Sequence, residues 1–254
     1  MGANGTEINV DDIELENIEL DDGYVEESVE VHRTAYVYTE QSLQTGIIES
    51  SGPDVTILEP LDVDANSLDF GELVAKIATR DAKAQPPIVE NPLESDWGNT
   101  RIIQMINNVF PRVKGPKGVA WCACAVTTWW TEAAKAKGLT PPLPGGGRTT
   151  DSEIPRAGNG YVPRWEYWAK TTGRFSATPI VGAAILYNPA ARAEADGTAT
   201  VSPGTFASHI GIVQSINSDN TFNAVDGNYR QRISFRSNLN TSRGVIGFVL
   251  PIIQ

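Results

Sequence analysis

The hydrophobic pattern between residues 119 and 138 predicts one helix. Its apolar positions recur at i, i+3, i+4, i+7 and i+11, the spacing of a single helical face; they are Cys122, Ala125, Val126, Trp129 and Ala133. Gly138 suits the left-handed residue that ends a helix. Cys124 lies about 200° around the helix axis from Cys122, so we expect it on a solvated face that also carries Thr128, Thr131 and Lys135.

Cys122 stands in the first turn of this predicted helix. The unpaired backbone N–H groups and the positive end of the helix dipole favour a thiolate there, and a thiolate is a nucleophile. Cys122 is therefore a candidate catalytic residue. The alternative is that both cysteines are small core side chains, since free cysteine is among the most buried residue types.

Two further helices are predicted on either side. The first follows residue 94, with Ser95 or Asp96 as its cap and Pro111 as its end. Its apolar stripe consists of Ile102, Ile106, Val109 and Phe110. The second begins at Pro163, ends at Gly173 and carries Trp165 and Trp168 as core residues. The loop over 141–161 is rich in Gly and Pro; we expect it to line a groove, the alternative being an ordinary surface loop.

From residue 181 onward, short apolar runs between turn residues predict antiparallel strands. In the run 208–216 we expect Ile210, Ile212 and Ile216 on one side. His209 then points to the other side, among small neighbours that leave it accessible. A hairpin with the next strand would bring Asp226 or Asn228 beside His209. Helices followed by strands predict an α+β fold.

The N-terminal third follows other patterns. Residues 1–30 hold eleven acidic side chains and no Lys or Arg, which leaves 20 acidic and 20 basic residues in the remainder. This acidic arm alternates Ile, Glu and Leu; it is either a solvated tail or an extended segment that docks onto a protein assembly. Residues 31–83 predict a small β module, in which 72–79 is one of the alternating runs and His32 is a surface residue. Residues 84–94 predict a linker.

Composition narrows the function classes. The chain has 254 residues, 41% of them hydrophobic, which suffices for a folded core. No apolar run approaches the roughly 20 residues of a membrane span, and the N-terminus has no secretory signal pattern, so we expect synthesis in the cytoplasm and no membrane partner. Without a basic excess, nucleic acid is excluded as a partner. The two cysteines provide neither a disulfide framework nor a metal site, and we expect no cofactor.

Three motifs in this order resemble one family. They are similar to motifs of CHAP domains, the cysteine- and histidine-dependent amidohydrolases/peptidases. The Trp-Cys-Ala segment of that family resembles W-C-A-C-A-V-T-T-W-W here, and its histidine strand resembles S-H-I-G-I-V. The third motif, usually E-G-N in the family, is D-G-N in this chain. The resemblance covers about 91–254 and implies a papain-like thiol hydrolase fold, with helices packed on an antiparallel sheet, over 95–254. It implies Cys122 as nucleophile, His209 as base, and Asp226 with Asn228 as the orienting pair. Residues 31–83 weakly resemble the Src-homology-3-like barrels that accompany cell-wall hydrolases.

The implied activity is cleavage of an amide bond in bacterial peptidoglycan, either between muramic acid and L-alanine or within the peptide. A chain of this kind would act at the cell wall after release, as a phage lysin, a virion or tail component, or an injected effector. Two other functions stay open: a structural or wall-binding component of a phage tail with a degenerate site, and a general cysteine protease. The chain departs from the family at Gly182-Ala183, where Gly-Asp is common, and at Asp226, where Glu is usual.

Overall fold

The computed structural model describes residues 58, 61, 64–65, 67–90, 99–110, 120–144, 158–193, 199–200 and 206–251. The acidic arm at 1–30, most of the β module at 31–83 and the central part of the loop at 141–161 lie outside these residues. The helices are α2 (Phe70–Ala82), α3 (Thr100–Val109), α4 (Cys122–Ala136), the 3-10 turn η2 (Gly158–Gly160) and α5 (Val162–Thr171). The strands are β1 (Phe175–Ser176), β2 (Ala184–Ala193), β3 (Ala199–Thr200), β4 (His209–Ile216), β5 (Phe222–Asp226), β6 (Ser234–Leu239) and β7 (Arg243–Val249).

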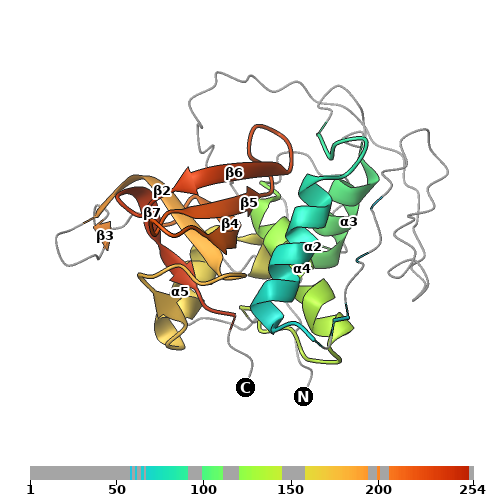
Figure 1. Cartoon of the computed structure of the whole chain (residues 1–254), viewed down its shortest axis with the longest axis horizontal. Helices are drawn as coiled ribbons and strands as arrows, with labels where there is room; N and C mark the ends of the chain where they lie inside the picture. Colours follow the sequence, from blue (N-terminus) through green and yellow to red (C-terminus); the bar gives the residue numbers. More distant parts are fainter. Residues whose placement is uncertain are drawn as a thin grey trace, which may run out of the picture.

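The strands form one antiparallel sheet in the order β1-β7-β2-β4-β5-β6, with β3 paired to β2. Figure 1 shows α2, α3 and α4 grouped beside this sheet, and α4 packs on β4. The expected α+β class with an antiparallel sheet is thus confirmed. The expected simple meander is not confirmed. Strands β2, β4, β5 and β6 lie side by side in chain order, but β7 then returns to pair with β2 on the side away from β4.

The core lies between the helices and the sheet. Its largest buried side chains on the helices include Trp129, Trp130 and Trp165, and they belong to the same buried cluster as Ile210 and Ile212 of β4. The prediction for Ile216 is wrong, because this side chain is 43% exposed. A register shift between Val213 and Ser215 adds one residue to β4, and this reverses the alternation of sides beyond it.

Helix α2 corrects the interpretation of the N-terminal region. The run 72–79, which we expected to be a strand of the β module, is helical. Asp69 caps it and forms a capping box with Glu72, and its buried residues Leu73 and Ile77 belong to the same core as α4. An apolar pattern with i, i+4 spacing also fits a helix, and burial against α4 selects that conformation.

The predicted linker at 84–94 is also wrong over its described part. Ala84 and Ile88 are 4% and 2% exposed and lie in the main core, and Val89 forms a β-bridge with Arg232. A further correction concerns α3, whose cap is Asn99, since its side chain accepts a hydrogen bond from the Arg101 backbone N–H. Ser95 and Asp96 lie outside the described residues.

The remaining helix predictions are confirmed. Helix α4 ends at Ala136, two residues before the predicted stop at Gly138, which has a φ of 65°. Helix α5 carries Pro163 in its first turn and is followed by Gly173, whose φ is 70°. Trp165 is fully buried against Trp130, with ring centroids 5.1 Å apart.

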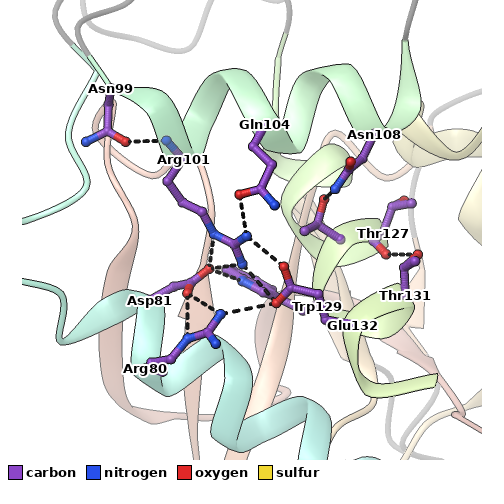
Figure 2. Close-up of polar contacts among 11 residues, drawn as sticks. Arg80, Asp81, Asn99, Arg101, Gln104, Asn108, Thr127, Trp129, Thr131 and Glu132 are labelled. Atoms are coloured by element: carbon purple, nitrogen blue, oxygen red, sulfur yellow. Dashed lines mark hydrogen bonds and ion pairs between the residues drawn. The ribbon is translucent and has the colours of Figure 1, made fainter. Parts of the chain in front are cut away.

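A buried ionic network joins the three grouped helices (Figure 2). Arg101 of α3 donates from Nε and Nη2 to Asp81 Oδ2 of α2 at 2.9 and 2.7 Å, and from Nη1 to Glu132 Oε1 of α4 at 2.7 Å. Trp129 Nε1 donates to the same Asp81 oxygen at 2.8 Å. Burial raises the pKa of Asp81, but Arg101 and Arg80 outweigh it and lower that pKa overall. This network fixes α4 against α2 and α3.

Candidate active site

Cys122 lies in the first turn of the helix, as predicted; it is the first residue of α4, which begins three residues later than the predicted start at Val119, and it is 2% exposed. Trp121 precedes it in the N-cap position and provides no side-chain cap. The first N–H groups of a helix have no intrahelical partner, so those at the start of α4 are available to an anion beside the thiol.

The prediction for Cys124 is wrong. This residue is 0% exposed, and burial, with Cys122 nearby, raises the pKa of its thiol. Thr128, predicted on the same solvated face, is also fully buried, and its Oγ1 lies 3.3 Å from Nδ2 of Asn108 on α3. The cause is that α3 covers the face that the sequence pattern leaves polar; the helix opens to solvent only near its end, at Lys135.

His209 begins β4 and faces both candidate partners. Its side chain is 16% exposed, and its Nε2 lies 3.5 Å from Asp226 Oδ1. Burial would lower the pKa of His209, but its interactions with Asp226 and Cys122 outweigh burial and raise the pKa from 6.5 to about 10. The imidazole is therefore cationic at neutral pH. Because Nε2 faces Asp226, we infer that Nδ1 faces the thiol.

The β4–β5 hairpin places Asp226 through a glycine. Gly211 pairs directly with Asp226 across the hairpin. A Cβ at position 211 would lie 1.8 Å from Asp226 Oδ1, so the missing side chain makes the space through which the carboxylate reaches His209. Asp226 itself is fully buried.

Asn228 occupies a different position. It lies in the turn after β5, is half-buried and has a φ of 57°. The ion-pair contact described for His209 is with Asp226. Of the four candidate residues, the structure thus brings together Cys122, His209 and Asp226. Asn228 makes no hydrogen bond or ion pair to these three in the described network.

Sequence reasoning missed three residues of the site. Arg236 of β6 donates from Nη1 to Asp226 Oδ2 at 2.9 Å. Its guanidinium stacks on Tyr187 and Tyr229, 5.2 and 4.6 Å from the ring centroids. The Tyr187 ring also lies 5.5 Å from the His209 ring. The one available signal was the alternation in R-I-S-F-R-S-N-L, which indicates the strand that became β6.

The segment before residue 91 also reaches the site. Glu90 Oε2 accepts a hydrogen bond from Trp121 Nε1 at 2.9 Å, and the Glu90 N–H donates to the Gln231 carbonyl at 2.7 Å. Burial raises the pKa of Glu90, although the Trp121 hydrogen bond opposes this. Residue 90 thereby ties the start of α4 to the turn between β5 and β6.

Comparison of the chain with protein-family models, curated proteins and solved structures finds no match. Among the helices that the structure describes, none is long and apolar enough to cross a membrane. Within the same described ranges, no group of three or more His, Cys, Asp or Glu side chains could hold a metal ion.

Proposed function

We propose that this chain is a cysteine-dependent amidohydrolase or endopeptidase that cleaves an amide bond of bacterial peptidoglycan. The observation that supports the chemistry is the meeting of Cys122, at a helix start, with a cationic His209 that contacts a buried Asp226. The substrate class, and the papain-like fold, come from the resemblance of the W-C-A, S-H-I-G-I-V and D-G-N motifs to CHAP domains.

The reaction begins with a Cys122 thiolate and a His209 imidazolium as an ion pair. The sulfur attacks the amide carbonyl carbon, and the backbone N–H of Cys122 helps to bind the oxygen as it becomes negative. The C–N bond then breaks, and His209 gives its proton to the leaving amine. The acyl group stays on sulfur as a thioester.

Water completes the cycle. His209 accepts a proton from water, which attacks the thioester carbonyl carbon. The C–S bond breaks, a carboxylic acid is released, which loses its proton to solvent, and the thiolate–imidazolium pair forms again. Asp226 contacts neither reactant; it holds the imidazole and offsets its positive charge.

The test is a digest of purified Gram-negative and Gram-positive peptidoglycan, with masses and free amino groups measured on the soluble products. We expect release by the wild-type chain and by Cys124→Ala, and none by Cys122→Ala. Cys124 is the matched control, because it is an equally buried thiol in the same helix. The new termini would identify the bond. No release from either wall type, with the thiol shown to be reduced, would refute the proposal.

The eleven acidic residues of the arm at 1–30 favour a second candidate, a structural component of a phage tail or related assembly. Sedimentation with a large particle, together with an inactive wall digest, would support this role. A casein digest in parallel tests the general protease, because a fold and a thiol site do not fix the substrate.

A further inference from the structure

The buried carboxylate of Asp226 has two partners, one for each oxygen. Oδ1 lies 3.5 Å from His209 Nε2, and Oδ2 accepts the hydrogen bond from Arg236 Nη1 at 2.9 Å. Asp226 is 0% exposed, so water does not compete for either oxygen. A charge-assisted hydrogen bond of this kind is strong and directional. The orientation of the carboxylate toward His209 is therefore coupled to Arg236.

Arg236 is itself held in place. It lies on β6 opposite Ala224, two residues before Asp226 on the neighbouring strand. Its guanidinium stacks on the rings of Tyr187 and Tyr229, and its side chain is 25% exposed. Planar stacking of a guanidinium on aromatic rings fixes both its position and its orientation.

Asp226 also has an alternative partner. The hydroxyl of Tyr187 is buried and has no hydrogen-bond partner among the described residues. Burial and the nearby charge of Asp226 raise the pKa of Tyr187 well above its usual value. Without Arg236, the carboxylate could turn toward this neutral hydroxyl and away from the imidazole.

We propose that Arg236 is a positioning residue, which holds Asp226 in the orientation that contacts His209. Arg236 touches neither the thiol nor the substrate in the proposed reaction; it acts through Asp226. The kinetic consequence rests on the proposed function, whereas the positioning itself can be measured without any substrate.

The direction in which the pKa of His209 changes when Arg236 is removed distinguishes a positioning role from the effect of a nearby positive charge. The titratable or charged groups around His209 are Cys122 from α4, Tyr187 from β2, Asp226 from β5, Tyr229 from the turn after β5, and Arg236 from β6. If Arg236 acted only as a nearby cation, its removal would raise the pKa of His209. If it positions Asp226, its removal lowers that pKa, because the imidazolium loses its carboxylate partner.

The experiment is an NMR titration of His209 in the full chain carrying Cys122→Ala, which removes the interfering thiol. The chain has two histidines, so His32→Asn assigns both resonances. We expect Arg236→Gln to lower the His209 midpoint by about one pH unit or more, and Arg236→Lys, which keeps the charge but not the planar fork, to lower it by less.

Arg230→Gln is the matched control, because Arg230 also stacks on Tyr229, at 5.6 Å, but has no bond to Asp226 in the described network. We expect it to leave the midpoint unchanged. A raised or unchanged midpoint in Arg236→Gln overturns the proposal. If that variant does not fold, as judged by circular dichroism, Arg236→Lys is used instead: a lowered His209 midpoint supports the proposal, and a raised or unchanged midpoint overturns it.

In the active chain, we expect Arg236→Gln to lower kcat more than it raises KM, and to have little further effect in an Asp226→Asn background. An independent effect on kcat in that background would contradict action through Asp226. A wild-type chain without wall activity would refute the proposed function, but it would leave the titration result intact.

Discussion

Substitution of Gly211 by alanine should disconnect Asp226 from His209. The added Cβ would lie 1.8 Å from Asp226 Oδ1 and 2.9 Å from its Cγ, far inside van der Waals contact. Gly211 and Asp226 are directly paired in the ladder, so the carboxylate must move rather than the backbone. Overpacking of this kind costs about 1–3 kcal/mol of folding free energy. Loss of the contact between Asp226 and His209, however, is detected specifically by the pH dependence of the free energy of unfolding.

His209 sets that dependence in a chain that carries Cys122→Ala. In the wild-type chain, the thiolate proposed for Cys122 offsets the proton that His209 gains, because the ion pair binds as many protons as a thiol and a neutral imidazole. The pKa of His209 in the fold is about 10, against an ordinary value of 6.5, and both Asp226 and Cys122 contribute to this rise. With Cys122 removed, we expect Asp226 to keep part of the rise, so above about pH 6.5 the folded chain binds more protons than the unfolded chain. The resulting stabilisation is fully present below about pH 6.5 and is lost as the pH rises through the folded pKa, with a limiting slope of about −1.4 kcal/mol per pH unit.

The assay is urea unfolding of chains that all carry Cys122→Ala, at several pH values above about pH 6.5. We expect Gly211→Ala to flatten the slope to less than half that of the Cys122→Ala parent, because the displaced carboxylate no longer favours the imidazolium. Gly160→Ala is the matched control: its Cβ would lie 2.2 Å from the Phe110 ring, and its nearest neighbours are Phe110 and Val109. It should lose comparable stability and keep the slope of the parent. A flat profile in the parent, or equal slopes in all three chains, would refute the reasoning.

Three further predictions concern single residues. Arg101→Leu should lower the free energy of unfolding by about 3–5 kcal/mol, because it leaves buried carboxylates without their cation; exposed Arg243→Leu should change it little, and urea midpoints compare the two. Asp226→Asn should lower kcat of the proposed reaction by about 10²-fold or more, and Asn228→Ala by much less; equal losses would return Asn228 to the orienting role. Glu90→Leu should destabilise the chain by about 1–3 kcal/mol, because a buried indole N–H loses its acceptor; an unchanged thermal melt would contradict this.

Local patterns were sufficient for those parts of the site that depend on one element or one hairpin. The periodicity around Cys122 predicted α4 with this cysteine in its first turn, and the alternation around His209 predicted β4. Asp226 followed from the length of the hairpin, because residues at the end of the second strand must pair with residues near the start of the first. The choice between Asp226 and Asn228 could not be made from spacing, since it depends on the pairing register.

Contacts between distant elements were not visible in the sequence. Cys124 was expected in solvent because its helical face carries threonines, and α3 instead covers that face. The run 72–79 was expected to be a strand, and packing against α4 makes it helical. In both cases a polar or ambiguous local pattern was overridden by tertiary burial, which has no signature within a window of ten residues.

Arg236 shows why a site contains more than its recognisable motifs. Its relation to Asp226 requires that β6 pair with β5 in the register that sets Arg236 opposite Ala224. A shift of that register by one residue would send the guanidinium to the other face of the sheet and leave a buried carboxylate without its cation. Asp226 and Arg236 therefore stabilise the same strand pairing that they require. The Arg236→Lys titration distinguishes this positioning from charge alone, because lysine preserves the charge but cannot reproduce the stacked, planar contact.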